Sequence, residues 1–338
     1  MPCPLRRTRD RVPVRRPGDA PSAERRVDSR TRATSLEGDP ARGCTRMARP
    51  ETTVGQVLLD RIEAQAVVLA GLDDAVRADA PDAVHRMRVA CRRLRSALRT
   101  FRRLLAPGAT DALVADLRWL GAALGRARDR EVLAERLAAR ARELPAACGP
   151  ERVADALEQW GEAEYRRVRP EVVAALDSPR RRALATALTT LLADPPLRPR
   201  AARAAAPELS RIAAHEQRRT AERLRLALAA DPAHRDRALH EVRKAAKRAR
   251  YAGETAALAV GPAAECYTER MKAVQELLGE HQDAVVAAAA LADRATEGGE
   301  PFAYGVLYAG QLAEAEAARA RLTQVWADAA KRKLTRFG

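Results

Sequence analysis

The chain has 338 residues, enough for one large domain or two of ordinary size with a sizeable core. Hydrophobic residues make up 47% of it, which excludes a chain that is disordered throughout, and the abundance of alanine and leucine favours helix. The formal net charge is +16, and residues 1–46 hold 12 Arg against 6 acidic residues, so residues 47–338 keep a net charge of +10. This basic field indicates an anionic partner without choosing among nucleic acid, polyphosphate and anionic lipid.

Five scattered cysteines without CxxC spacing predict reduced thiols in a cytosolic protein, and neither a disulfide framework nor a zinc site. The longest uncharged apolar run, residues 284–292, is too short to span a bilayer, and the N-terminus lacks the pattern of a signal peptide. We therefore expect a cytoplasmic protein with no membrane partner.

Residues 1–46 are rich in Pro, Gly, Ser, Asp and Arg and are expected to be a disordered basic segment, with Met47 as an alternative translation start that mass spectrometry of the native N-terminus would test. From residue 52 onward, apolar periodicity predicts helix after helix and no strand of useful length. The expected helical segments are 52–78, 82–105, 110–124, 129–144, 151–176, 180–193, 207–230, 235–258, 262–278, 282–296 and 301–333. Gly125 interrupts the pattern in the first half, and a proline-rich linker at 194–200 separates a first repeat (52–193) from a second (201–333) within one helical domain, 47–338.

The two halves match each other in two blocks. The run that begins at His85 and ends at Arg95 aligns with the run from His240 to Arg250, with histidine on histidine and four later basic positions on basic residues. The second block pairs Arg118, Leu124-Gly125 and Asp129 with Lys272, Leu278-Gly279 and Asp283. Because both blocks keep their order and separation, we expect a duplicated helical unit.

The first block predicts a helix with two distinct edges. At about 100° per residue, one stripe holds His85, Arg88, Arg92, Arg95, Arg99 and Arg103, and a separate apolar stripe holds Met87, Leu94, Leu98, Phe101 and Leu105. Residues 85–103 contain eight Arg and no acid, and like charges four residues apart destabilise a helix, so either carboxylates of other helices or a mobile anion must neutralise the stripe. The planar guanidinium fork suits phosphate oxygens. A solvated charged face is the plain alternative, which the repetition of the pattern disfavours.

The second copy repeats this stripe over a shorter length. It holds His240, Arg243, Lys247 and Arg250, with Lys244, Arg248 and Tyr251 beside them, and Glu254 ends it at the position that matches Arg99. We therefore expect the first half to bind more strongly. Arg93, Arg118 and Lys272 extend the predicted polyphosphate-binding set, although ordinary exposure explains the last two nearly as well, and the group of Arg218, Arg219, Arg223 and Arg225 is regarded as peripheral.

At these residues the chain resembles the CHAD family, the conserved histidine α-helical domain. The resemblance covers about residues 52–333 and rests on His85-x-x-Arg88-x-x-x-Arg92-Arg93-x-Arg95, on its counterpart from His240 to Tyr251, and on the two Leu-Gly-x-x-x-Asp blocks. It implies an all-α fold of two four-helix bundles related by a pseudo-two-fold axis, with a basic surface or central cavity between them. It also implies binding of inorganic polyphosphate and association with polyphosphate granules. CHAD domains often accompany a triphosphate-tunnel (CYTH) domain, which we do not expect within this sequence because the helical halves fill its folded region.

Several roles stay open for the remaining candidates. His85 and His240 have three alternative roles: hydrogen-bond donors to phosphate that act best when protonated, metal ligands, or residues that start their helices. No acidic residue at ligand spacing accompanies both histidines, which disfavours a metal site. Asp129 and Asp283 either cap the segment that follows each glycine or pair with an arginine of the stripe. Lys247 stands where the first half has Arg92, which keeps the charge but loses the bidentate fork. His215, His234 and His281 lack repeat partners and are regarded as incidental.

Four classes of function are in competition: a polyphosphate-binding module, a nucleic-acid binder, an enzyme that acts on phosphate chains, and a scaffold for other proteins. Aromatic residues make up only 3% of the chain, so base stacking is poorly supported, although binding to a duplex through its phosphates stays open. The sequence has no Gly-rich phosphate loop, GxSxG or HExxH motif, so we expect neither catalysis nor a cofactor.

Overall fold

The computed structural model describes residues 52–298 and 300–337, and these residues form an all-α fold, as the sequence predicts. The expected disorder of residues 1–46 and the alternative start at Met47 lie outside the described residues. The α-helices are α1 (Val54–Ala70), α2 (Asp73–Arg77), α3 (Ala83–Thr100), α4 (Asp111–Arg142), α5 (Pro150–Asp177), α6 (Pro179–Ala193), α7 (Ala205–Leu228), α8 (Pro232–Val260), α9 (Pro262–Glu297) and α10 (Pro301–Ala329). Short 3-10 helices lie at Arg102–Leu104, Ala146–Cys148, Pro199–Ala202 and Arg332–Thr335.

Most helices start at the signals that the sequence provides. The hydroxyl of Thr53 accepts a hydrogen bond from the backbone N–H of Gln56 at the start of α1, and Ser178 does the same for Arg181 at the start of α6. Proline occupies the first turn of α5, α6, α8, α9 and α10, where its missing N–H has no intrahelical partner to lose.

Four predicted helix boundaries are wrong. The segment 52–78 is two helices, because the chain turns at Gly71. The segment 82–105 ends as an α-helix at Thr100 and continues as a 3-10 turn. Gly125 does not interrupt a helix, and neither does Gly279, at which we ended the predicted segment 262–278: they lie inside the long helices α4 and α9. A single interior glycine costs about 1 kcal/mol, which the buried faces of these two helices override.

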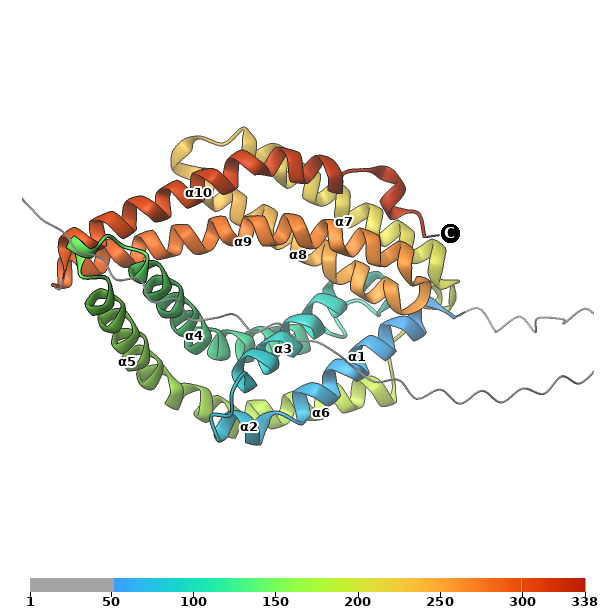
Figure 1. Ribbon diagram of the computed structural model, residues 1–338. Coiled ribbons are helices and arrows are strands. Elements are labelled where there is room, and N and C mark those ends of the chain that lie inside the picture. The colour runs from blue at the N-terminus through green and yellow to red at the C-terminus, as the bar shows by residue number, and fades with distance from the viewer. Residues whose placement is uncertain (1–51, 299, 338) are drawn as a thin grey trace, which may run out of the picture. The chain divides into compact units, whose positions relative to one another are not determined.

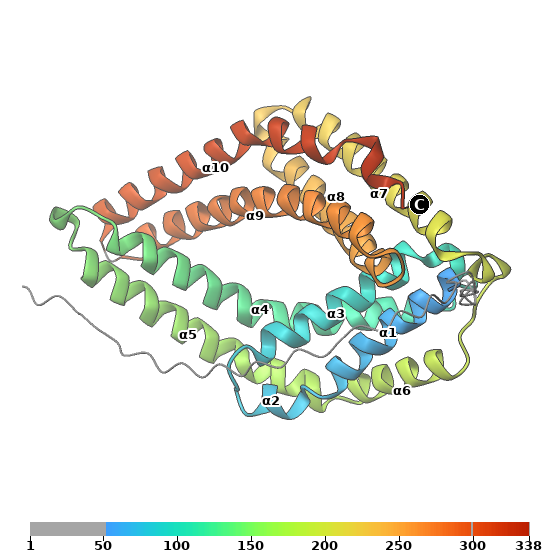
Figure 2. The same ribbon diagram turned by 45° about the vertical axis from the view of Figure 1, so that its right-hand side comes forward.

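The helices form two long arms that meet at both ends (Figures 1 and 2). In both views the green pair α4 and α5 converges with the orange and red pair α9 and α10, while α1, α3, α7 and α8 lie toward the opposite end (Figures 1 and 2). Helix α3 contacts α8, and α1 contacts both α7 and α8, so helices of the two repeats touch directly at that end. None of the helices within 52–298 and 300–337 has an apolar stretch long enough to cross a membrane.

Two hydrophobic clusters hold the halves together. The larger one is continuous from the first repeat, with Leu58 and Leu94, to the second, with Val242 and Tyr267. The smaller one, which includes Leu137 and Tyr304, joins the converging ends of α4, α5, α9 and α10. The repeats therefore share a core instead of each closing one of its own. The pseudo-two-fold relation between them stays a prediction.

The proline-rich linker packs onto the end of the first basic helix. The N–H of Ala106 donates to the carbonyl of Pro196, and the N–H of Arg198 donates to the carbonyl of Leu104, each at 2.8 Å. This pairing brings the start of the second repeat beside the 3-10 turn at Arg102–Leu104.

A close helix crossing predicts a measurable loss of stability. A Cβ atom at Gly253 of α8 would lie 2.3 Å from Oγ1 of Thr268 and 2.8 Å from the ring of Tyr267, so these side chains would have to shift. We expect Gly253→Ala to lower the free energy of unfolding by about 1–3 kcal/mol in urea titrations. Gly310→Ala is the matched control: a Cβ there meets nothing within 4 Å, and the change should stabilise α10 by about 0.5–1 kcal/mol. Equal effects of the two changes would contradict the close crossing.

Candidate anion-binding groove

The basic stripes of the two repeats face each other across one groove. This cationic groove is a cavity of about 410 Å³ between α3, α4 and α8, and its lining contains nine Arg and Lys side chains and no carboxylate among the described residues. Its basic residues are Arg88, Arg92, Arg95, Arg99, Arg118, Arg243, Lys244, Lys247 and Arg248, and His240, Ser96 and Tyr251 lie among them. The self-matching blocks thus supply one shared site and not two separate surfaces.

The buried faces of α3 and α8 orient the two stripes. All five residues of the predicted apolar stripe of α3 are at most 1% exposed, which confirms that prediction. On α8, Val242, Ala245, Ala246 and Ala249 are fully buried. Because these faces are fixed in the shared core, the basic residues between them are held toward the groove.

Several groove cations have no protein counter-ion. In the part of the chain that the structure describes, no ion pair involves Arg95, Arg99, Arg118 or Arg243. Arg99 and Arg118 are exposed. Burial together with the charges of Arg99, Arg118 and Arg92 lowers the pKa of Arg95. An arginine stays charged under such conditions, so the groove carries positive charge that carboxylates do not neutralise.

The two glycines of the repeat make room for one arginine each. A Cβ atom at Gly125 would lie 3.6 Å from Nε of Arg88, and one at Gly279 would lie 3.6 Å from Nε of Arg243. Each guanidinium therefore lies directly against the helix backbone of the neighbouring helix, at the same repeat position. This close approach gives the Leu-Gly blocks a packing role in place of the predicted helix break.

The predicted capping role of Asp129 and Asp283 is wrong, because both lie inside continuous helices. The alternative of an ion pair holds for Asp129, whose Oδ1 lies 2.7 Å from Nη1 of Arg88. No described residue forms an ion pair with Asp283, although it occupies the matching position. The pair at Asp129 is largely exposed and is worth at most about 1 kcal/mol.

Arg93 and Arg250, which the sequence placed in the binding set, do not line the groove. Both pair with Glu254, at 3.4 Å and 3.2 Å, and Arg61 of α1 approaches the same carboxylate at 2.7 Å. This half-buried cluster of three arginines on one glutamate joins α1, α3 and α8. The structure therefore gives Arg93 and Arg250 a carboxylate partner that lies outside the lining of the groove.

Three further predicted residues lie outside the cationic groove. Arg103 follows the end of α3, so it leaves the helical stripe. Lys272 lies on α9, 3.4 Å from Glu269. His85 is exposed in the first turn of α3 and is not part of the lining, whereas its repeat partner His240 is. Arg118, for which ordinary exposure was the alternative, does line the groove.

Both repeated histidines have depressed basicity. Although His85 is largely exposed, partial desolvation lowers its pKa, and nearby Arg128 and Arg92 lower it further. Burial and Lys244 lower the pKa of His240, whose Nδ1 has no hydrogen-bond partner among the described residues. The free protein therefore holds both rings neutral near pH 7, and the predicted protonated donor forms only at more acid pH.

Lys247 keeps only part of the charge of its repeat partner Arg92 in the free protein near pH 7. Burial, and then the charge of Arg243, lower the pKa of the Lys247 ammonium to about 7. Arg92 itself donates through Nε to the hydroxyl of Tyr251, a buried side chain that lies between the two stripes. Tyr251 thus positions an arginine and offers no open ring face for stacking.

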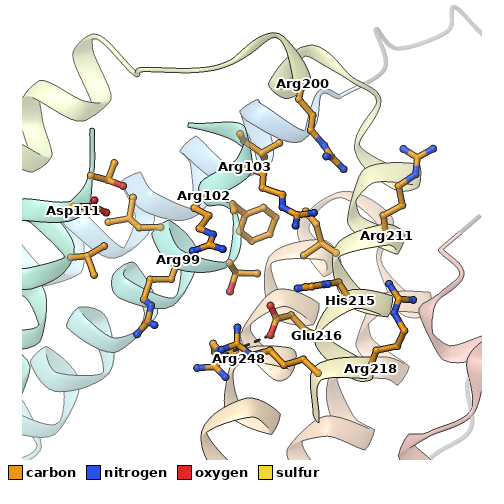
Figure 3. Close-up of a pocket in the computed structure, with 18 residues that line it drawn as sticks. Arg99, Arg102, Arg103, Asp111, Arg200, Arg211, His215, Glu216, Arg218 and Arg248 are labelled. Carbon is orange, nitrogen blue, oxygen red and sulfur yellow. Dashed lines mark ion pairs between the residues drawn. The ribbon is translucent and has the colours of Figure 1, made fainter. Parts of the chain in front are cut away.

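Sequence reasoning missed a second, larger cavity that continues from the groove. This arginine pocket, about 640 Å³, lies between the end of α3, the 3-10 turn that follows it and α7 (Figure 3). Arg99 and Arg248 line both cavities. Arg218 and Arg219, which the sequence analysis set aside as peripheral, line this pocket together with His215 and Glu216. Their run on α7 has no counterpart in the repeat, so the self-match gave no signal for them.

The described residues thus define an all-α protein built on a repeated basic helix, with an exposed cationic groove where the repeats meet. The chain belongs to the CHAD family: the model of the CHAD domain matches residues 60–292. The uncharacterized proteins MT2285 and Rv2226, from two strains of Mycobacterium tuberculosis, are each 36% identical over 270 residues, which is 78% of this chain. The chain spans about half the length of these curated relatives.

Two solved structures are similar in fold. PptA from Streptomyces chartreusis superposes with a TM-score of 0.67 at 26% sequence identity, over 81% of this chain and 99% of its own. The CHAD domain from the plant Ricinus communis superposes with a TM-score of 0.63 at 28% identity, over 82% of this chain and 92% of its own.

Proposed function

We propose that the cationic groove binds inorganic polyphosphate. One observation carries the proposal: nine basic side chains from both repeats line one cavity, to which none of the residues that the structure describes contributes a carboxylate. A chain of phosphates presents a negative charge at every unit, so it can contact the cations of α3 and of α8 at the same time. Membership in the CHAD family supports this ligand class.

The spacing of the cations fits an extended ligand. Arg88, Arg92, Arg95 and Arg99 follow one another at intervals of three or four residues, which is about 5 Å of helix rise. Each guanidinium can donate two parallel hydrogen bonds to phosphate oxygens. The extension of the groove into the arginine pocket through Arg99 and Arg248 lengthens the positive path.

Binding to nucleic-acid phosphates is the second candidate, and the structure favours it less. Proteins that bind single strands stack bases on aromatic side chains, whereas the one aromatic residue of the groove, Tyr251, is 4% exposed and holds Arg92. We also propose that the protein binds polyphosphate without catalysing a reaction on it, and that the groove recruits the chain to polyphosphate granules.

A competition experiment tests the proposed ligand. The protein is loaded with labelled long-chain polyphosphate at near-physiological salt and titrated with unlabelled polyphosphate, duplex DNA or single-stranded RNA of equal phosphate concentration. We expect unlabelled polyphosphate to displace the label at concentrations at least about tenfold lower than either nucleic acid. Equal displacement by DNA or RNA would contradict the proposal and favour nucleic-acid binding as the function.

A further inference from the structure

The arginine pocket differs from the cationic groove because apolar side chains form one part of its lining, which we call its floor. Besides its arginines it is lined by the apolar side chains of Leu98, Phe101, Leu104, Val114 and Ile212. Its volume of about 640 Å³ lies in the range of small-molecule sites, which combine an apolar surface with a few convergent polar groups. A bare phosphate chain makes no use of such a floor.

A buried carboxylate is set into this floor. Glu216 of α7 is 4% exposed, lines the pocket, and points toward Arg248 (Figure 3). Its Oε2 lies 3.7 Å from Nε of Arg248, which is beyond hydrogen-bond reach, and neither atom has a hydrogen-bond partner among the described residues. The Glu216 carboxylate thus has only this long ion pair with Arg248, so a ligand N–H that reaches it gains a strong, charge-assisted hydrogen bond.

The rim of the same pocket is strongly positive. Arg200 and Arg211 share the buried Glu208, but no ion pair within 52–298 and 300–337 neutralises five other arginines. These are Arg99, Arg102, Arg103, Arg218 and Arg219. Arg102 and Arg103 come from the turn after α3 and Arg218 from α7, so they approach the pocket from opposite sides (Figure 3).

These features select a ligand with two unlike ends. A pure polyanion would satisfy the arginines but be repelled by Glu216, and a neutral apolar molecule would leave the arginines without a counter-ion. We propose that the arginine pocket binds a nucleoside polyphosphate, with its base on the apolar floor, an N–H of the base donating to Glu216, and its phosphates on the arginine rim. The inference goes beyond the proposed binding of inorganic polyphosphate and does not depend on it.

Guanosine triphosphate is the probe for the test, because the edge of guanine presents two adjacent N–H donors to a carboxylate. Isothermal titration of the full chain compares it with inorganic triphosphate at equal ionic strength. We expect GTP to bind at least about tenfold more tightly, since hydrogen bonds to a buried charge are strong. Equal affinities would overturn the proposal and make the pocket a continuation of the polyanion path.

Two variants locate the binding. Glu216→Gln keeps the shape of the side chain but removes the charge, so the preference for GTP over triphosphate should fall to about threefold or less. An unchanged preference would overturn the role of Glu216. The double change Arg102→Gln and Arg218→Gln, at exposed rim positions that leave the core intact, should weaken GTP binding about tenfold or more. Unchanged GTP binding in that variant would place the ligand elsewhere and overturn the site.

The control is the exposed pair Arg166→Gln and Arg182→Gln, which removes the same charge on α5 and α6 and should leave GTP affinity unchanged. A loss of GTP affinity equal to that of the rim variant would show that net charge sets the affinity, and it would overturn the site. Long-chain polyphosphate is titrated into the same wild-type preparation. If the protein binds GTP but does not bind polyphosphate, only the proposed function is refuted. If it binds polyphosphate but does not prefer GTP over triphosphate, only this inference is refuted.

Discussion

Replacement of Arg88, Arg92, Arg95 and Arg99 by glutamine is expected to lower the affinity for long-chain polyphosphate by about 100-fold or more at physiological salt. Each change removes a charged hydrogen-bond donor from the α3 side of the cationic groove, and such bonds contribute about 1.5–3 kcal/mol each before the losses overlap. The slope of log affinity against log salt concentration should become shallower by about 3, because the variant makes four fewer phosphate contacts and its binding therefore releases fewer counterions.

The fold should survive these four substitutions. Arg88 loses an exposed ion pair with Asp129, and Arg92 loses a hydrogen bond to Tyr251, while the apolar face of α3 is untouched. Helical circular dichroism should therefore stay close to that of the wild type. Fluorescence anisotropy with labelled polyphosphate, recorded at several salt concentrations, measures both the affinity and the slope.

The matched control removes four charges outside the groove. Arg152, Arg166, Arg182 and Arg321 are exposed on α5, α6 and α10, and their replacement by glutamine lowers the net charge by the same amount. We expect a loss of affinity of less than about threefold for this variant, since only the general field weakens. A similar loss in both variants would mean that net charge, and not the groove, binds the polyanion.

The repeated pattern was sufficient to predict the central elements of the site. The apolar residues at helical spacing on α3 fixed its buried face, and the face left over had to carry Arg88, Arg92, Arg95 and Arg99. The match of His85 with His240 placed the second stripe on α8. Arg93 and Arg250 were overassigned, because both pair with Glu254: Arg250 from four residues earlier on α8, and Arg93 from α3, a contact that periodicity on one helix does not reveal.

The residues that escaped prediction depend on contacts between distant segments. Gly125 suggests a break when α4 is considered alone, yet the guanidinium of Arg88 lies against it and the helix continues. The arginine pocket forms where the end of α3 meets α7, so Glu216 acquires its setting only in the folded chain. The basicity of Lys247 likewise depends on its neighbours across the groove.

Lys247 is expected to couple polyphosphate binding to proton uptake. Burial lowers its pKa most, and four arginines from both stripes lower it further: Arg243, Arg92, Arg88 and Arg250. A pKa of about 7 in the free protein, against an ordinary value of 10.5, leaves the amine mostly neutral at pH 8. Bound phosphate favours the ammonium form and raises this pKa, so at pH 8 binding should take up as much as about one proton.

The sign of the pH dependence follows from the same shift. Affinity should rise by up to about tenfold per unit as the pH falls from 9 toward 7, and then level off once the free protein is protonated. Stability of the free protein runs the other way: the unfolded chain binds this proton more readily than the folded one, so stability falls between pH 10.5 and 7 and the loss is complete below 7. His85 and His240 titrate below this window because their pKa values are lowered.

Two substitutions separate Lys247 from the other titrating groups of the groove. Lys247→Met is permanently neutral, so it should bind more weakly, take up almost no proton at pH 8, and make the free protein more stable at pH 7. Lys247→Arg is permanently charged and should bind with an affinity that hardly changes between pH 7 and 9. Isothermal titration at pH 8 in two buffers of different ionisation enthalpy counts the protons. Uptake of the same size in the wild type and in Lys247→Met would assign the proton to another group and refute the lowered basicity of Lys247.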